Sequence, residues 1–159
     1  MSTTLSRRKL FKAGGGVLAG AALVSTAAGA QAADQGAVNE ALVRVWYGLW
    51  ASQRDWAPYD AMLADDFAFS STNGEDHIGK AEFKANCWAP NVNLTKSLDI
   101  ELIMSKGDEV VVKYLGRTTS GKGFRNVELL RVRGGRIESI ECYFGGKSTF
   151  PAAVEAQKT

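Results

Sequence analysis

The second half of this 159-residue chain alternates apolar and polar residues over four stretches, which are separated by short glycine-containing segments. The stretches cover residues 98–105, 110–117, 124–132 and 137–144. Alternation with a period of two residues is typical of strands with one buried face, and short glycine-bearing links are typical of hairpin turns. The pattern therefore predicts a meander of four antiparallel strands.

Helical periodicity precedes these strands. Apolar residues recur at helical spacing from Val38 to Trp50 and predict a helix that is buried on most sides. A second short helix is expected over residues 56–63 and a strand over 67–69. A third helix is expected from Lys80 to Trp88, and Pro90 should end it. Helices followed by a meander predict an α+β fold, with the N-terminal helices packed on one face of a mostly antiparallel sheet.

The N-terminus has the composition of an export signal. Residues 1–32 contain no acidic residue, and an Ala- and Gly-rich stretch follows the basic residues Arg7, Arg8, Lys9 and Lys12. A basic start, a weakly apolar middle and a small-residue end predict a secretory signal peptide, cleaved after Ala30 or Ala32. An uncleaved anchor is the alternative, although residues 13–30 would barely span a bilayer of ~30 Å.

The segment from Ser6 to Lys12, with Arg7-Arg8 near its start, resembles the twin-arginine export motif. This resemblance implies the twin-arginine export machinery as a partner and a periplasmic or secreted location. Residues 1–32 are then a signal peptide, and residues 33–159 form a single domain.

Removal of residues 1–32 changes the sign of the net charge. Four of the 19 Lys and Arg residues lie there, which leaves 15 against 17 Asp and Glu and a net charge of −2. Without a basic stripe, no nucleic-acid partner is expected. One His, two Cys and the lack of a phosphate loop or dinucleotide motif predict neither a metal nor an organic cofactor. Cys87 and Cys142 either pair outside the cytoplasm or remain buried thiols.

Four short motifs resemble the nuclear transport factor two-like superfamily, which includes ketosteroid isomerase and the SnoaL-like polyketide cyclases. They are Leu63-Ala64-Asp65-Asp66-Phe67, Ile78-Gly79-Lys80-Ala81, Arg133-Gly134-Gly135-Arg136-Ile137 and Tyr143-Phe144-Gly145. The resemblance covers roughly residues 37–146. It implies a curved sheet whose concave face holds the helices, a conical pocket for apolar ligands, and homodimers formed through the outer face of the sheet.

Glu128 is the first candidate catalytic residue. It shares strand parity with Leu130 and Val132, so it faces the pocket if they do. An apolar pocket disfavours the ionised carboxyl, raises its pKa and allows it to donate a hydrogen bond at neutral pH. Ketosteroid isomerase uses a protonated Asp beside a Tyr in this way. The resemblance puts that Asp at Glu128 and that Tyr at Tyr47 or Trp46. It puts the general base at Ser71, which cannot take a carbon-bound proton.

Three further candidate catalytic residues are Tyr47, His77 and Asp76. The Tyr47 hydroxyl needs a partner when buried, which makes it a polar pocket candidate. His77 is the only imidazole and suits proton transfer, although a structural role is equally open. Asp76 precedes a helix and is expected to cap it. The expected ligand-binding residues are Trp46, Trp50, Phe69, Trp88, Tyr114 and Asn126.

Two functions remain open from the sequence. The first is an exported pocket protein that acts on a small apolar carbonyl compound by cofactor-free isomerisation, cyclisation or dehydration. The second is a non-enzymatic carrier or dimeric accessory module with the same fold, which Ser71 favours. Val111, Leu115, Val127 and Leu129 predict a modest apolar patch on the outer sheet face, which suits a dimer.

Overall fold

The structure is a computed structural model that describes the backbone of residues 19–144 and the side chains of residues 34–144. The chain divides into two units, Met1–Gln31 and Ala32–Thr159, and the fold belongs to the second. The elements are α1 (Ala19–Ser52), α2 (Ala57–Met62), β1 (Leu63–Ser71), α3 (Lys80–Phe83), the π-helical turn η1 (Lys84–Trp88), α4 (Ala89–Val92), β2 (Thr95–Lys106), β3 (Glu109–Thr118), β4 (Gly123–Arg133) and β5 (Arg136–Phe144).

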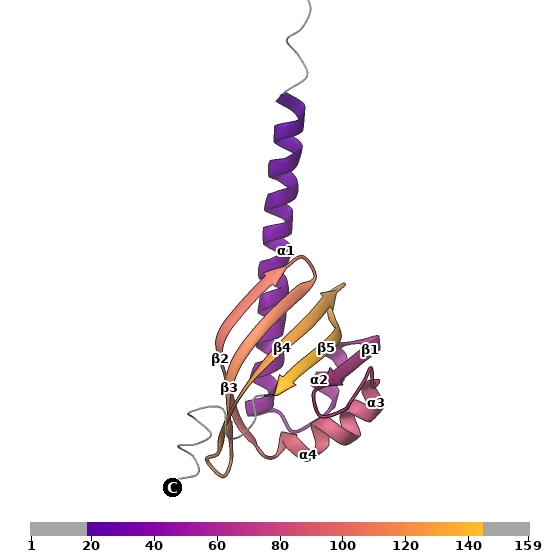
Figure 1. Cartoon of the computed structure of the whole chain (residues 1–159). Coiled ribbons are helices and arrows are strands. Elements are labelled where there is room, and N and C mark those ends of the chain that lie inside the picture. The colour runs from indigo at the N-terminus through magenta and orange to yellow at the C-terminus, as the bar shows by residue number, and fades with distance from the viewer. Residues whose placement is uncertain (1–18, 145–159) are drawn as a thin grey trace, which may run out of the picture. The chain divides into compact units, whose positions relative to one another are not determined.

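The five strands form one curved sheet in the order β1-β5-β4-β3-β2. Strands β2 to β5 are the predicted antiparallel meander, and β1 pairs with β5 in parallel. The α2 and α3 helices lie beside β1, and α4 lies below the sheet, where the chain leads toward β2 (Figure 1). The α+β class and the mostly antiparallel sheet predicted from the sequence are therefore confirmed.

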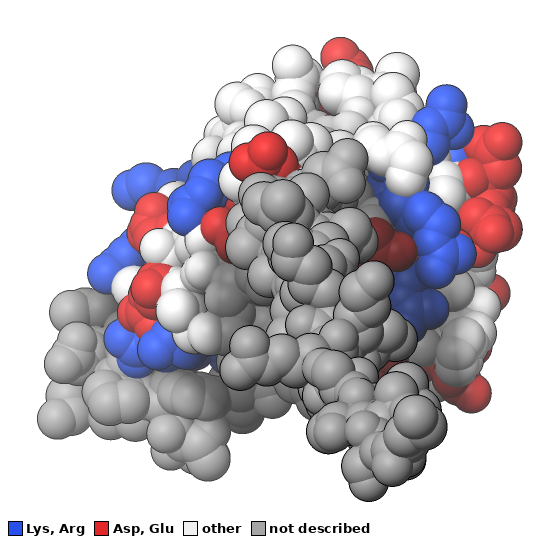
Figure 2. Space-filling view, turned by 90° about the horizontal axis from the view of Figure 1, so that it is seen from above, with Lys and Arg blue, Asp and Glu red and all other residues white. Residues whose placement is uncertain are grey.

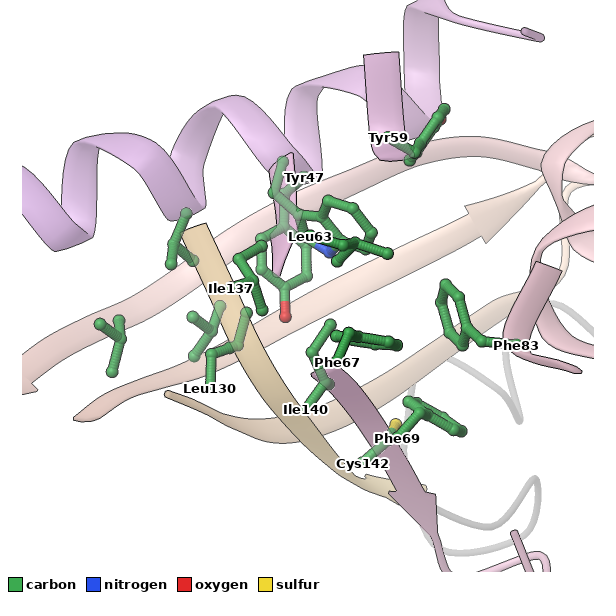
Figure 3. Packing of buried hydrophobic residues seen from close by; sticks show 14 of the residues in the cluster. Tyr47, Tyr59, Leu63, Phe67, Phe69, Phe83, Leu130, Ile137, Ile140 and Cys142 are labelled. Carbon is green, nitrogen blue, oxygen red and sulfur yellow. The ribbon is translucent and has the colours of Figure 1, made fainter. Parts of the chain in front are cut away.

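The core lies between the helices and the inward face of the sheet. Alternate residues of β3 and β4 are buried, as the period of two predicts, and the part of α1 after residue 34 buries one face against them. Figure 3 shows Tyr47 projecting from α1 toward the strands, among Leu63, Leu130, Ile137 and Ile140. The fully buried residues at this contact are Val43, Trp46, Leu63, Val110, Val112, Leu130 and Ile137.

The third helical segment differs from its prediction, because Pro90 does not end it. The chain remains helical to Val92, and Pro90 lies in the first turn of α4, where a missing N–H costs little. The π-helical turn η1 changes the hydrogen-bond spacing just before the proline. Asn91 Nδ2 then donates to the Cys87 carbonyl oxygen at 2.8 Å. The first strand is also longer than predicted, at Leu63–Ser71.

Asp65 joins three of the motifs that carry the family resemblance. Its carboxylate lies 3.7 Å from Lys80 Nζ and 3.3 Å from Arg136 Nη1. The helix-to-strand turn, the start of α3 and the last hairpin therefore meet at one exposed ion-pair cluster. Figure 2 shows that Lys or Arg and Asp or Glu lie intermixed over the described part of the surface seen from above.

The predicted export signal lies largely outside the described residues, which exclude Arg7, Arg8, Lys9 and Lys12. Within the part of the chain that the structure describes, no helix is both long and apolar enough to span a membrane.

Candidate functional site

A cavity of about 220 Å³ lies between the helices and the sheet. Aromatic and aliphatic side chains make up most of its wall, which suits a small and mostly apolar ligand. The lining residues are Trp46, Tyr47, Trp50, Phe69, Phe83, Cys87, Asn91, Leu94, Thr95, Leu98, Tyr114, Thr118, Phe124, Glu128, Ile140, Cys142 and Phe144.

The two ends of the cavity differ in polarity. Asn91, Leu94 and Phe144 are exposed and mark its mouth. Polar side chains near the mouth are satisfied by the backbone, since Thr95 Oγ1 donates to the Asn91 carbonyl at 2.9 Å and Thr118 Oγ1 to the Lys122 carbonyl at 3.3 Å. The buried polar cluster around Glu128 is therefore the feature that distinguishes the inner end.

The Glu128 carboxyl is buried and accepts three hydrogen bonds from three different elements. Tyr47 of α1 donates to Oε2 at 2.6 Å, and Tyr114 of β3 donates to Oε1 at 2.7 Å. Cys142 of β5 donates to Oε1 at 3.3 Å. Strand register produces this cluster, because Glu128 lies opposite Val112 on β3 and opposite Cys142 on β5.

Asn126, two positions before Glu128 on β4, extends the cluster. Its Nδ2 donates to the Tyr114 hydroxyl oxygen at 2.9 Å, and Tyr114 is its direct cross-strand partner. Asn126 is itself buried. The amide therefore holds the Tyr114 hydroxyl in place rather than lining the cavity.

Burial sets the protonation behaviour of this cluster. Loss of solvent raises the pKa of Glu128, and the hydrogen bonds from Tyr47, Tyr114 and Cys142 offset only part of that rise. Burial, followed by the nearby Glu128 charge, raises the pKa of both Tyr47 and Tyr114. Among the described residues, no Lys, Arg or His forms an ion pair with Glu128. The cavity thus holds a proton-binding group without a counter-charge.

The structure brings several of the sequence-predicted residues to this cavity. Trp46, Trp50, Phe69 and Tyr114 line it together with Tyr47 and Glu128. Trp88 does not line it. Its indole ring is buried against Trp56 and Tyr59, at centroid distances of 5.2 and 5.7 Å.

Asp76 and His77 do not meet the other candidates. Their side chains are 84% and 80% exposed, and Asp76 Oδ1 lies 2.5 Å from His77 Nδ1. The His77 backbone is left-handed, with φ at 52°, and its N–H donates to Ser70 Oγ at 3.0 Å. This turn directs both side chains away from the cavity wall, so they are not part of the site described here. Asp76 also makes no side-chain cap, because the residue that precedes α3 is Gly79.

Two positions need separate mention. Ser71, where the resemblance puts a general base, lines a different hollow of about 150 Å³ and hydrogen-bonds to the Glu75 carboxylate. Cys142 contacts the Glu128 carboxyl, a role that sequence reasoning missed.

Cys87 and Cys142 are free thiols, and burial raises the pKa of Cys87 to about 11, which disfavours a thiolate nucleophile. The described residues hold no cluster of three or more metal-binding side chains.

Replacement of Glu128 tests the raised pKa. A carboxyl whose pKa is higher folded than unfolded contributes stability that is complete below its unfolded pKa and is lost as the pH rises through its folded pKa. The free energy of unfolding of the wild type, relative to E128Q, should therefore fall with rising pH, by about 1.4 kcal/mol for each unit of pKa difference. Denaturant unfolding measured as a function of pH checks this. A wild-type advantage that grows with pH would contradict the assignment.

Comparison with known proteins gives the family. Residues 43–140 match the family model for the SnoaL-like domain, whereas a search of curated proteins found no relative. An LEH-like epoxide hydrolase from M. tuberculosis superposes with a TM-score of 0.63 at 17% identity, covering 78% of this chain and 95% of that chain. A de novo designed protein with a curved β-sheet gives 0.59 at 14% identity, covering 76% and 95%.

A third structure, from Catenulispora acidiphila, is a hypothetical protein with a ketosteroid isomerase-like fold in complex with trimethylamine. It has a TM-score of 0.56 at 18% identity and covers 71% of this chain and 92% of that chain. Identities this low support the fold and carry no activity across. The family match covers more than half of the sequence, and it agrees with a sheet, helices and cavity of the expected kind. This chain belongs to the SnoaL-like family.

Proposed function

We propose that this protein binds a small, mostly apolar carbonyl compound in the cavity and polarises its oxygen through Tyr47 and Glu128. The observation that carries the proposal is the 2.6 Å hydrogen bond between these side chains at the inner end of an otherwise apolar cavity. A carboxyl with a raised pKa keeps its proton at a higher pH than an ordinary carboxyl does. Such a group stabilises the negative charge that develops on a carbonyl oxygen during enolisation or related steps.

The corresponding reaction is cofactor-free acid–base chemistry, such as isomerisation, cyclisation or dehydration. Each of these reactions needs a donor at an oxygen and a group that accepts a proton from the substrate. Glu128 is the one carboxyl among the described residues of the cavity wall. It would therefore have to serve both steps, or the substrate would have to supply one of them.

A non-enzymatic carrier is the second candidate, and a specific observation favours it. Ser71 is bonded to Glu75 away from the cavity, and Asp76 and His77 are exposed to solvent. A second carboxylate or an imidazole is thus absent from the described wall. A carrier needs only the apolar volume and one polar anchor.

Native mass spectrometry of the purified protein, followed by assays of the co-purifying compound and its carbonyl analogues, separates the two candidates. If the protein is an enzyme, E128Q should lower turnover by about 100-fold or more, the usual contribution of a general acid, and change binding only a few-fold. Glu82→Gln is the matched control on an exposed helix. Turnover that survives E128Q would remove Glu128 from the mechanism, and a bound compound that is never converted would favour the carrier.

We also propose a homodimer formed through the outer face of the sheet. Leu102 and Met104 on β2, Val127 on β4 and Tyr143 on β5 are between 39% and 52% exposed and share this face by register. Beside them, Glu101 lies 3.2 Å from both Lys113 and Arg125. The face therefore carries acidic and basic side chains, which can pair with those of a second copy across a two-fold contact.

Light scattering coupled to size-exclusion chromatography tests the dimer. The wild type should elute as a dimer, and Val127→Glu should elute as a monomer because the substitution puts two like charges at the contact. The Val38→Glu variant alters an exposed valine on α1, 59% exposed against 39% for Val127, and should remain dimeric. A monomeric wild type over the whole concentration range would rule the proposal out.

Export through the twin-arginine pathway is a further part of the proposal. The features that support it are the paired Arg7 and Arg8 and the small residues around Ala30 and Ala32. Replacement of Arg7 and Arg8 by lysines should leave the uncleaved chain in the cytoplasm, as measured by cell fractionation and N-terminal sequencing. Cleavage and export of that variant at the wild-type level would contradict this route.

A further inference from the structure

We infer that Tyr47, rather than Glu128, is the group that contacts the ligand's oxygen, and that Asn126 directs the hydrogen-bond chain that makes Tyr47 a donor. The inference rests on the proposed carbonyl ligand and assigns to each residue of the polar cluster a distinct task. Tyr47 touches the ligand, Glu128 supplies the proton, and Tyr114 and Asn126 are positioning residues.

The chain begins at Asn126. Because Asn126 Nδ2 donates to the Tyr114 hydroxyl oxygen at 2.9 Å, the Tyr114 proton points away from Asn126 and toward Glu128 Oε1, 2.7 Å distant. A tyrosine hydroxyl has a single proton, so this bond direction is determined by the amide. Tyr114 is therefore committed to Glu128 and cannot donate to a ligand.

The two oxygens of Glu128 are not equivalent. Oε1 accepts from Tyr114 and from Cys142, whereas Oε2 accepts only from Tyr47. A proton added to the carboxyl therefore binds at Oε2, where it displaces the fewest existing donors. The Tyr47 oxygen is the polar atom within hydrogen-bond distance of Oε2, so the new Oε2–H donates to it.

Protonation of Glu128 thus reverses one hydrogen bond. With Glu128 ionised, Tyr47 donates to Oε2, and the wall offers the ligand only acceptors at this end. With Glu128 protonated, Tyr47 accepts from Oε2–H, and its own proton turns to the cavity, where a carbonyl oxygen can accept it. If the proton transfers, the Tyr47 O–H bond breaks as a ligand O–H bond forms, and the Oε2 proton passes to Tyr47. The result is ionised Glu128, with Tyr47 donating to Oε2.

The other groups that face Glu128 do not change the direction of these hydrogen bonds. They are Tyr47 from α1, Tyr114 from β3, Cys142 from β5 and Asn126 on its own strand, with the Cys87 thiol of η1 on the cavity wall. In the described part of the chain, no second carboxylate lines the cavity and no basic side chain pairs with Glu128. Protonation of Glu128 alone therefore reverses the hydrogen bond between Glu128 and Tyr47.

The test uses two probes of the same shape. Acetophenone carries a C=O group where α-methylstyrene carries C=CH₂, so the ratio of their dissociation constants isolates the hydrogen bond to the oxygen. Calorimetric titration of the mature protein between about pH 5 and pH 9 brackets a carboxyl whose pKa is raised by burial. Below the Glu128 midpoint, acetophenone should bind about 3- to 10-fold more tightly than α-methylstyrene, the range of one net hydrogen bond. Above the midpoint, this preference should disappear or reverse, because the wall then offers the carbonyl oxygen only acceptors.

Two matched Tyr→Phe variants decide which hydroxyl is the donor. Tyr47→Phe should abolish the preference for acetophenone at every pH, together with the downfield ¹³C shift of the bound carbonyl. Tyr114→Phe should keep the preference and move its midpoint to higher pH, because Glu128 loses one donor to its ionised form. Asn126→Leu should also move the midpoint and weaken the preference. Loss of the preference in Tyr114→Phe with retention in Tyr47→Phe would overturn the inference.

Infrared spectroscopy tests the chain without any ligand. When the proton is on Oε2, Oε1 is the carbonyl oxygen of Glu128, and Tyr114 is one of its donors. Loss of a hydrogen bond to a carbonyl oxygen raises the frequency of the C=O stretch. The stretch of Glu128, identified by its loss in E128Q, should therefore rise more in Tyr114→Phe than in Tyr47→Phe. The opposite order would place the proton on Oε1 and overturn the inference. If neither probe binds while the infrared order is as expected, the proposed carbonyl function fails and the hydrogen-bond chain stands.

Discussion

A buried carboxyl without a cationic partner is the constraint on which the site depends. Desolvation of an ionised carboxylate costs several kcal/mol, and three donors from three elements offset part of this cost for Glu128. Hydrogen bonds to charged groups contribute about 1.5–3 kcal/mol each. The fold must therefore hold α1, β3 and β5 at fixed distances from β4. The hydrogen bonds that offset the desolvation cost of Glu128 also define the inner end of the cavity.

The apolar remainder of the cavity strengthens this effect. Trp46, Trp50 and Phe124 line the same cavity as the polar cluster and lower its local dielectric constant, so each hydrogen bond is stronger there than in water. The mouth differs, because Asn91 and Thr95 bond to the backbone and leave the wall apolar. A ligand is therefore oriented by one end only. This geometry suits a molecule with a single oxygen on an apolar body.

The likeness to solved structures informs the fold more than the chemistry. A designed protein and a natural epoxide hydrolase share the curved sheet at 14% and 17% identity, which agrees with the general rule that one fold supports unrelated functions. Function has to be argued from Glu128 and its neighbours. Ser71 illustrates the point, because the resemblance gives it the position of a base, whereas the structure turns it toward Glu75. Asp76 and His77 likewise looked suitable by residue type, but the left-handed turn at His77 exposes both.

The sequence by itself determined the α+β class, the four-strand meander and the inward parity of Glu128, because alternation and glycine turns are local signals. The register that pairs Tyr114 with Asn126 was decided by the tertiary structure. Only the tertiary structure decided the pairing of Glu128 with Cys142. The Gly134-Gly135 hairpin alone would put Glu128 opposite Glu141, and a register shift between Arg131 and Val132 moves Cys142 there. It also decided that Tyr47 reaches Oε2, because a contact between residues 81 positions apart depends on how a helix packs on a sheet.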